Sequence, residues 1–451
     1  MQKALRVVIV GGVACGPKTA SRLKRLLPSC EVTMIDKGAQ VSYGACGLPY
    51  YVEGLFPEVD MLMQTPVGVL RDAEFFEKVK GFRTLVRTEA VGIDREKKTV
   101  RVRRLESGLE EDLPYDKLVL ATGSRPVQPP VPGLELENVW SMRRPEDAET
   151  LVKQIEAHEL RKAVLIGAGY IGVEMAEALR GLGLSVTMVE MLDQVMPRFL
   201  DAEMAMLAAK HLRQKGVDLA LGERVVSIEG NGKVQSVRTD RNTYPADLVL
   251  VGAGVTPNDE LARNAGIACA PMGGILINHY CQTSDPDIYA GGDCVVNHYV
   301  DPMTRAPLFV PLGSTSNKHG RTIADDIAGL PHPFPGITAT GVCKAFDITI
   351  GRTGMTEKQA GELDPDIESV IWAGPDLPHY MPESKPLVIK LVASRRTRKL
   401  LGVQVLGPGT ADKRLDVAAS SIYFGAKVDL SLIHISEPTR LLSISYAVFC
   451  L

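Results

Sequence analysis

The first part of the chain alternates short apolar runs with helix-like stretches. Residues 6–10 form such a run, typical of a central parallel strand, and a glycine-rich turn and a helix-like stretch follow it. A second strand at 31–36 then ends in an acidic residue. The same order returns at 163–190. The pattern predicts an α/β fold with two Rossmann-like dinucleotide-binding domains.

The first glycine turn contains Gly11, Gly12 and Gly16, although a valine takes the second glycine position of the usual G-x-G-x-x-G spacing. Glycines allow the tight turn, and a helix N-terminus attracts a pyrophosphate. Asp36, followed by Lys37, ends the second strand, where a carboxylate binds an adenosine ribose. These five residues are expected to bind a dinucleotide.

The second turn carries all three glycines, Gly167, Gly169 and Gly172, between a strand and a helix-like stretch at 173–182. Glu190 ends the next strand, and no arginine follows it directly. A carboxylate there accepts bonds from ribose hydroxyls and repels a 2′-phosphate. The sequence therefore predicts NADH rather than NADPH at this second site.

Two more strand ends extend the first nucleotide domain. The strand at 118–126 turns sharply after Ala121 and Thr122, at Gly123, and the strand at 287–293 ends with Gly292 and Asp293. Since the 163–190 unit lies between them, the second domain is expected to be inserted into the first. The expected domains are 1–148 with 259–332, 149–258 and 333–429.

The pattern changes after about residue 336. Strand-like runs at 386–392 and 400–406 predict a separate C-terminal α+β domain. Residues 430–451 differ again and resemble a translated sequencing-library adapter, so this tail, with Cys450, is expected to be non-native.

Cys46 lies in the stretch 41–51, just before a Gly-Leu-Pro sequence that suits a helix start. Helix N-termini favour the thiolate, so we expect a lowered thiol pKa and a nucleophilic sulfur. The alternative is a small buried core residue. The fifth residue after Cys46 is Tyr51, so the C-x-x-x-x-C pair of two-cysteine reductases is absent from the sequence. Cys46 is therefore expected to cycle through a mixed disulfide, persulfide or sulfenic acid.

Composition narrows the class of protein. The 451 residues are 45% hydrophobic and 23% charged, with a net charge of −3, which gives no sign of nucleic-acid binding. Eight scattered cysteines form no C-x-x-C, so no zinc or other metal site is expected. There is no apolar run of about 18 residues and no signal peptide. We expect a cytoplasmic protein with reduced thiols and no membrane span.

Taken together, Cys46, both glycine turns and the strand ends at 121–123 and 291–293 resemble the single-cysteine branch of the pyridine nucleotide–disulfide oxidoreductases. The resemblance covers residues 1 to about 429. It implies a glutathione reductase-like fold, FAD bound by 1–148 and 259–332, NADH bound by 149–258, and a homodimer joined through the C-terminal dimerisation domain. It also implies that electrons pass from NADH through FAD to Cys46.

Within that branch, peroxidases carry a histidine where this chain has Ala14, which disfavours a peroxidase. The resemblance places Lys18, Arg22 and Arg25 where coenzyme A-disulfide reductases hold their ligand, and cations there suit coenzyme A phosphates. A solvated helix face is equally consistent with their spacing. Other ligand or active-site positions of the branch fall on Ser42, Asn317 and Tyr380, whereas Ala45 replaces an asparagine found in many members.

The leading hypothesis is an FAD-dependent NADH oxidoreductase that reduces coenzyme A disulfide, persulfide or polysulfide through Cys46. One alternative is an NADH oxidase that reduces dioxygen. Another is an electron-transfer reductase for a redox protein partner, in which Cys46 is incidental. A nucleotide-binding redox sensor without turnover is the remaining possibility.

Overall fold

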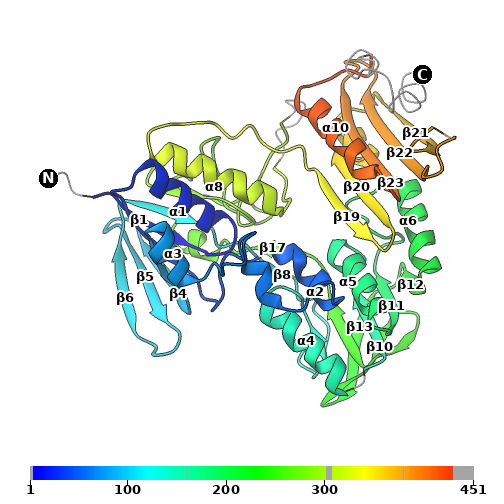
Figure 1. The fold of residues 1–451 in the computed structure, drawn as a ribbon, viewed down its shortest axis with the longest axis horizontal. Helices are drawn as coiled ribbons and strands as arrows, with labels where there is room; N and C mark the ends of the chain where they lie inside the picture. Colours follow the sequence, from blue (N-terminus) through cyan, green and yellow to red (C-terminus); the bar gives the residue numbers. More distant parts are fainter. Residues whose placement is uncertain (1–3, 159, 301–306, 379, 430–451) are drawn as a thin grey trace.

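Figure 1 shows the computed structural model, which describes residues 4–158, 160–300, 307–378 and 380–429. Two bodies are built on parallel sheets, and the third, coloured yellow to orange, is built on an antiparallel sheet. The structure thus confirms the predicted fold class, two Rossmann-like domains and a C-terminal α+β domain. The predicted tail 430–451 lies outside the described residues, and the domain limits at 148, 258, 332 and 429 stay predictions.

The first body holds a five-stranded parallel sheet in the order β18-β7-β1-β2-β3. Residues 7–10 of its central strand are buried, as expected of a parallel strand covered on both faces. Helices α1 and α8 lie side by side on this sheet (Figure 1). Its elements are β1 Arg6–Val10, α1 Cys15–Leu26, β2 Glu31–Ile35, α3 Ala73–Lys80, β3 Arg83–Leu85, β4 Thr88–Asp94, β5 Thr99–Arg104, β6 Glu110–Pro114, β7 Lys117–Leu120, α7 Glu260–Asn264, β18 Ile288–Ala290 and α8 Gly313–Ile327.

The second body repeats the plan, with the sheet order β12-β11-β10-β16-β9. The second body is inserted in the sequence of the first one. The chain passes from the first body to the second at β8 and returns at β17, and these two strands form an antiparallel pair. Helix α5 begins directly after Gly169, three residues earlier than the sequence predicts. The elements are β8 Ser124–Pro126, β9 Val139–Trp140, α4 Pro145–His158, β10 Lys162–Ile166, α5 Tyr170–Gly181, β11 Ser185–Glu190, α6 Ala202–Gln214, β12 Val217–Leu221, β13 Val225–Asn231, β14 Lys233–Thr239, β15 Thr243–Pro245, β16 Leu248–Val251 and β17 Val255–Pro257.

The third body is an antiparallel sheet in the order β19-β20-β23-β22-β21, with α10 packed on β20 and β23. Strand β19 also packs on α5, so this body meets the second one. The elements are β19 Gly341–Ala345, β20 Ile348–Gly354, α9 Glu357–Leu363, β21 Ile367–Pro375, β22 Pro386–Ser394, β23 Leu400–Gly407 and α10 Ala411–Tyr423. Within the described ranges, every helix is too short or too polar to cross a bilayer.

Three short helices follow β2 in the sequence and lie where the first body packs on the second: η1 Ala45–Gly47, α2 Leu48–Val52 and η2 Val59–Met63. Pro49 stands in the first turn of α2, as predicted, because a missing N–H costs nothing there. Helix α2 packs on both α4 and α5. The segment that carries Cys46 is therefore held between the two parallel-sheet bodies.

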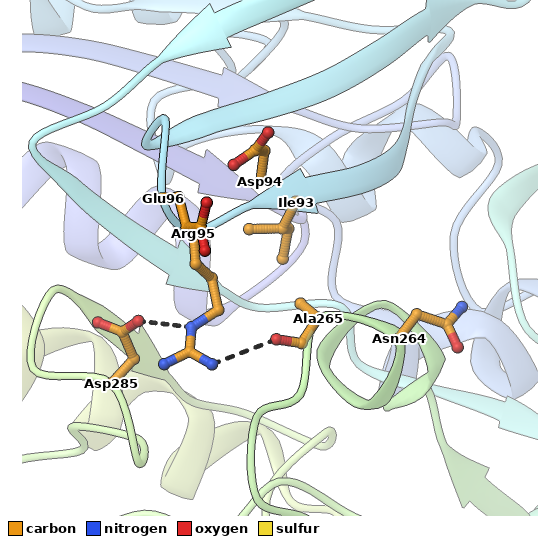
Figure 2. Close-up of a pocket in the computed structure, with 7 residues that line it drawn as sticks. All are labelled: Ile93, Asp94, Arg95, Glu96, Asn264, Ala265 and Asp285. Atoms are coloured by element: carbon orange, nitrogen blue, oxygen red, sulfur yellow. Dashed lines mark hydrogen bonds and ion pairs between the residues drawn. The ribbon is translucent and has the colours of Figure 1, made fainter.

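A surface hollow of about 660 Å³ lies on the first body, away from both glycine turns. Figure 2 shows Arg95 reaching across it, with its guanidinium 2.7 Å from the Asp285 carboxylate and 3.4 Å from the Ala265 carbonyl oxygen. Arg95 is thus bound by groups of the hollow itself, and we assign no ligand to it.

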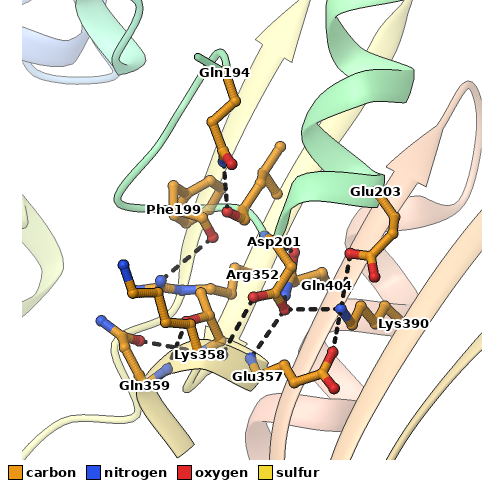
Figure 3. Close-up of polar contacts among 12 residues, drawn as sticks. Gln194, Phe199, Asp201, Glu203, Arg352, Glu357, Lys358, Gln359, Lys390 and Gln404 are labelled. Atoms are coloured by element: carbon orange, nitrogen blue, oxygen red, sulfur yellow. Dashed lines mark hydrogen bonds and ion pairs between the residues drawn. The ribbon is translucent and has the colours of Figure 1, made fainter. Parts of the chain in front are cut away.

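A polar clasp, made by Asp201, Glu203, Glu357, Lys390 and Gln404, joins the second and third bodies (Figure 3). The side chain of Lys390 is 1% exposed, and its ammonium lies 2.7 Å from Glu357, 3.0 Å from Glu203 and 3.3 Å from Asp201. Asp201 also accepts hydrogen bonds from the Glu357 N–H at 2.9 Å and from the Gln404 side chain. The clasp satisfies its own charges and fixes how the two bodies meet.

Candidate active site

The first glycine turn has no room for a side chain at its glycine positions. A Cβ at Gly11 would lie 2.0 Å from the Ala121 carbonyl oxygen, and one at Gly16 would lie 1.9 Å from the Gly11 carbonyl oxygen. Gly11 also has φ +116°, which L side chains rarely adopt. The turn therefore brings the start of α1 against the ends of β1 and β7, as the sequence predicts for a nucleotide turn.

Asp36 fastens this turn. Its carboxylate accepts hydrogen bonds of 2.7 Å from the N–H groups of Gly12 and Gly38. Lys37, beside it, is exposed. Asp36 lies at the end of β2, and its carboxylate oxygens can each accept a further hydrogen bond, for example from a ribose hydroxyl. Its role in ribose binding therefore stays a prediction.

The start of α1 suits an anion. In the described chain no side chain caps this helix, and its first turn contains no acid, so no side chain satisfies the first N–H groups or the positive end of the dipole. Combined with the glycine cradle, this donor set fits the pyrophosphate of a dinucleotide such as FAD.

The turn at 121–123 is tied to the chain that leaves the second body. The Thr122 hydroxyl donates to the Asn258 carbonyl oxygen at 2.6 Å, and the Asn258 side chain donates to the Thr122 carbonyl oxygen at 2.8 Å. Gly123 takes φ +68°, so the sharp turn predicted there is present. Ala121, Thr122 and Gly123 thus line one edge of the first glycine turn.

Asp293 follows the Gly291–Gly292 turn and is half-buried. Its pKa is raised because burial disfavours the charge, against hydrogen bonding by Ser316 and attraction by Arg143. The Ser316 hydroxyl donates to Asp293 at 3.1 Å. His319 is fully buried, and its Nδ1 accepts from the Gly292 N–H at 3.1 Å, while burial lowers its pKa to about 4. A neutral imidazole therefore supports the turn that presents Asp293.

The second glycine turn has the same construction. A Cβ at Gly172 would lie 2.2 Å from the Gly167 carbonyl oxygen, whereas one at Gly169 would meet no described atom within 4 Å. Glu190 accepts from the N–H groups of Ala168 at 2.9 Å and Leu192 at 3.0 Å. Space beside Gly169 and a carboxylate at the end of β11 fit a second dinucleotide.

Cys46 lies on η1 and is exposed, so the buried-core alternative is wrong. The prediction of a lowered thiol pKa is also wrong. Desolvation raises the pKa of Cys46, and the negative charges of Glu174 and Asp293 raise it further. The five-residue helix α2 supplies too small a dipole to outweigh these effects.

Sequence reasoning missed an acidic cluster beside Cys46. Burial and the charge of Glu177 raise the pKa of Glu174 to about 7. Tyr50, four residues after Cys46, has a pKa raised to about 12 by burial, with a further contribution from Glu174. Arg143, near Asp293, was missed as well. The one local sign of this cluster in the sequence was an acid, Glu174, in the otherwise apolar start of α5. A sequence does not show which other element packs against that acid.

The basic residues of α1 divide into two kinds. Arg22 makes a bidentate ion pair with Asp325 of α8, whose side chain is 8% exposed. Lys18 is half-buried, and Arg25 is exposed. Burial lowers the pKa of Lys18, and Arg321, Arg25 and Arg22 lower it further. Arg321 of α8 therefore belongs to this cationic patch, although the sequence analysis did not single it out.

The other predicted ligand residues lie in different places. Ser42 donates its N–H to the Gly12 carbonyl oxygen at 2.8 Å and has φ +56°, a strained value for serine. Asn317 is half-buried on α8, and its side chain donates to the Gly313 carbonyl oxygen at 3.0 Å. Tyr380 lies in the third body between β21 and β22, with 72% exposure. The structure thus brings Ser42 and Asn317, but not Tyr380, to the first nucleotide body.

Comparison with known proteins gives relatives along nearly the whole chain. It is 37% identical over 420 residues to the NAD(P)H coenzyme A polysulfide/persulfide reductase of Pyrococcus horikoshii, covering 93% of this chain and 91% of that protein. It is 34% identical over 423 residues to an NADH oxidase of Methanocaldococcus jannaschii, covering 93% and 91%. The coenzyme A disulfide reductase of Staphylococcus haemolyticus is 26% identical over 431 residues, covering 94% and 93%.

Among solved structures, an NAD-dependent persulfide reductase from A. fulgidus superposes with a TM-score of 0.93 at 40% identity, covering 96% of this chain and 79% of that one. Residues 341–437 match the dimerisation domain of the pyridine nucleotide-disulphide oxidoreductases. That match extends into the suspected tail, and nothing in the comparisons supports an adapter origin. Residues 5–310 match the family's main domain. The chain belongs to the pyridine nucleotide-disulphide oxidoreductase family.

Proposed function

We propose that this protein is an FAD-dependent NADH oxidoreductase that reduces coenzyme A disulfide, persulfide or polysulfide through Cys46. The position of Cys46 carries this proposal. It is exposed and lies between the two nucleotide bodies, close enough for Asp293 of one and Glu174 of the other to affect its thiol. A thiol there can exchange with a sulfur substrate from solvent beside both cofactors.

The predicted cofactor residues divide between the two turns. FAD would be held by Gly11, Gly12, Gly16, Asp36, Lys37, Ala121, Thr122, Gly123, Gly292 and Asp293, within 1–148 and 259–332. NADH would be held by Gly167, Gly169, Gly172 and Glu190, within 149–258. When bound, the flavin accepts hydride from the nicotinamide and supplies electrons to sulfur. Two observations support the assignment: the uncapped start of α1 and the open space at Gly169.

The sulfur chemistry then belongs to Cys46. Its thiolate attacks a coenzyme A disulfide, so a mixed disulfide forms and one coenzyme A thiolate leaves. Two electrons that originate from NADH cleave the mixed disulfide, which restores Cys46 and releases the second thiol. The sum is NADH, one proton and one disulfide giving NAD⁺ and two thiols. A persulfide substrate gives one thiol and hydrogen sulfide instead.

The cationic patch is the proposed recognition site for coenzyme A phosphates. Lys18, Arg25 and Arg321 are the residues that we expect to contact them, since like charges gathered on α1 and α8 attract an anion. Arg22 is engaged by Asp325 and would act by positioning the two helices. Ser42 and Asn317 remain proposed ligand contacts, and Tyr380 remains a proposed active-site aromatic.

Reduction of dioxygen is the second candidate, because a relative of similar identity is named an NADH oxidase. NADH consumption in air, measured with and without coenzyme A disulfide or polysulfide, separates the two. An increase of at least tenfold with the sulfur acceptor supports the main proposal. Equal rates with stoichiometric loss of oxygen would favour the oxidase.

The decisive variant is Cys46→Ser, which keeps the size of the side chain but removes the sulfur nucleophile. We expect FAD binding and flavin reduction by NADH to persist, while turnover with sulfur acceptors falls by several decades. Cys269→Ser, at a half-buried thiol outside the site, is the matched control and should behave as wild type. Wild-type turnover of Cys46→Ser would favour electron transfer to a redox protein instead.

We further propose a homodimer joined through the C-terminal dimerisation domain, which the family match supports. A cytoplasmic location is proposed from the thiols. The structure describes seven cysteines, and all seven are free, as expected in a reducing compartment.

A further inference from the structure

The segment 191–201, which joins β11 to α6, lies against the second glycine turn. The Met196 N–H donates to the Ala168 carbonyl oxygen at 2.8 Å. The Phe199 ring packs on the ring of Tyr170, the first residue of α5, with centroids 4.6 Å apart. The segment therefore contacts the turn both through its backbone and through a side chain, so its conformation affects the shape of the turn.

The backbone of this segment is strained at one point. Met196 is buried and has φ +49°, a left-handed value that costs energy for a residue other than glycine. Within the segment, the Gln194 side chain donates to the Leu200 carbonyl oxygen at 2.9 Å. Strained backbone of this kind persists only where surrounding contacts hold it. The position of the segment must therefore depend on the elements that pack against it.

The third body supplies one of these contacts through Arg352 of β20 (Figure 3). Its side chain is buried, and its Nη1 donates to the carbonyl oxygens of Arg198 at 3.1 Å and Phe199 at 3.3 Å. The guanidinium also lies over the Phe199 ring, 5.0 Å from the ring centroid. A buried cation is costly unless polar groups or a ring face it, and here those groups belong to the segment. Arg352 thus holds the residue that packs on Tyr170.

The clasp holds the end of the same segment. Gln404 of β23 is fully buried, its side-chain oxygen accepts from the Asp201 N–H at 2.9 Å, and its amide nitrogen donates to the Asp201 carboxylate. Strand β19 also reaches the turn directly, because a Cβ at Gly341 would lie 2.2 Å from the Tyr170 hydroxyl oxygen. The third body therefore holds the segment at residues 198–201 and packs closely on Tyr170.

We propose that the third body sets the affinity for NADH, with Arg352 and Gln404 as positioning residues that hold the segment 191–201 against the second glycine turn. This inference rests on the proposed assignment of NADH to that turn. Neither residue needs to touch the nucleotide, because a turn that is ordered before binding loses less conformational freedom when the nucleotide binds. Loss of either contact should therefore weaken the binding of NADH and leave the chemical steps nearly unchanged.

The first test is nucleotide binding to FAD-loaded variants. Arg352→Met keeps the length of the side chain but removes its hydrogen bonds and charge, and Gln404→Leu removes both bonds to Asp201. NAD⁺ is the probe, because it does not reduce the flavin. For both variants we expect the Kd for NAD⁺, measured by titration calorimetry, to rise about tenfold, as for loss of one charge-assisted hydrogen bond. Arg352→Lys keeps the charge but not the planar fork of donors, so its Kd should lie between those of wild type and Arg352→Met.

Kinetics separate positioning from a general loss of structure. KM for NADH should rise with the Kd, whereas kcat with coenzyme A disulfide should stay within about twofold of wild type. Enzyme reduced beforehand with dithionite should react with the disulfide at the wild-type rate, because Cys46 is untouched. Flavin absorbance and melting temperature show whether each variant is folded and holds FAD. A lower melting temperature together with wild-type Kd and KM would overturn the inference, since both residues would then act on stability alone.

Asp347→Ala is the matched control. Asp347, in the turn between β19 and β20, also joins the third body to the second, because its carboxylate lies 3.0 Å from His211 of α6 and 2.8 Å from Lys215. These contacts lie at the far end of α6 from the segment 191–201. The control should therefore bind NAD⁺ as wild type does, even where its melting temperature falls. An equal rise in its Kd would show that the effect is not specific to the segment and would also overturn the inference.

A second measurement uses the wild-type enzyme and does not depend on any variant. Coupling between two sites is reciprocal, so bound nucleotide should strengthen the hold of the third body on the segment. The N–H groups of Asp201 and Glu357 donate across the clasp, the latter to the Asp201 carboxylate at 2.9 Å. Saturating NAD⁺ should therefore slow hydrogen exchange in peptides that contain these residues. Slower exchange in the second body alone, without a change at Glu357, would contradict the inference.

Glu190→Ala separates two kinds of failure. If this variant binds NAD⁺ as tightly as wild type, the assignment of NADH to the second glycine turn is wrong, and the inference loses its basis. If Glu190→Ala binds NAD⁺ more weakly, while Arg352→Met and Gln404→Leu bind it as wild type does, the assignment stands and only the role of the third body is wrong.

Discussion

At the scale of single residues, each nucleotide unit uses one carboxylate in the same way. Asp36 accepts from the Gly12 N–H, and Glu190 accepts from the Ala168 N–H, so each acid braces the glycine turn opposite it. The order strand, turn, helix, strand is local, which is why the sequence predicted where both acids lie. Burial raises the pKa of Cys46 most, and the charges of Glu174 and Asp293 add to it. All of these depend on residues that are distant in sequence, so the sequence could not predict the direction of this shift.

The hydrogen bond from the Ala168 N–H to Glu190 allows a more specific prediction about the preference for NADH over NADPH. Glu190→Gln keeps an acceptor for the Ala168 N–H but loses the charge, so we expect the preference for NADH over NADPH to narrow by roughly tenfold. Glu190→Ala should narrow it similarly and also raise KM for NADH, because the turn loses its brace. Ratios of kcat/KM for the two cofactors measure this. A wild-type preference at or below unity, or an unchanged ratio in both variants, would contradict the assignment.

At the scale of elements, the pairing of α1 with α8 decides which basic residues can meet a ligand. Helical spacing placed Lys18, Arg22 and Arg25 on one helix, but it could not show that Arg22 faces Asp325, 303 residues further along the chain. Arg321 was invisible for the same reason. Local patterns predict elements, whereas the neighbours of a face follow from tertiary packing.

Because of this helix pairing, we expect Arg25 and Arg321 to affect substrate binding and Arg22 to affect stability. Arg25→Ala and Arg321→Ala should raise KM for coenzyme A disulfide by about tenfold and leave inorganic polysulfide nearly unaffected, since only the former carries phosphates. Arg22→Ala should instead lower the free energy of unfolding by roughly 1–3 kcal/mol, because Asp325 loses its partner. Kinetics with both acceptors and thermal melts check this. If KM changed equally for both acceptors, the cationic patch would be a solvent-exposed helix face without a role in binding coenzyme A.

At the scale of the whole molecule, the clasp between the second and third bodies is the feature that the sequence could least predict. Two βαβ units and a strand-rich C-terminal part were visible as local patterns, and their fold class is confirmed. Lys390 lies in an apolar strand where a lysine suggests an exposed edge, yet it is 1% exposed. Its partners Asp201 and Glu203 belong to another body, so its burial depends on how the bodies dock.

The clasp therefore makes a prediction about stability. Lys390→Met leaves Asp201, with 8% exposure, without its cation, and we expect a loss of about 3–5 kcal/mol in the free energy of unfolding. Adding Asp201→Asn removes the stranded charge and should recover part of that loss. In the wild type, burial lowers the pKa of Lys390, but the hydrogen bonds that its ammonium donates to Glu357 and Glu203 outweigh burial and raise this pKa. The stabilisation should thus be complete below about pH 10 and disappear as pH rises through the higher folded pKa. Chemical denaturation of the three proteins at neutral and alkaline pH measures both effects, and equal stability of wild type and Lys390→Met at neutral pH would show that the clasp contributes no net stabilisation.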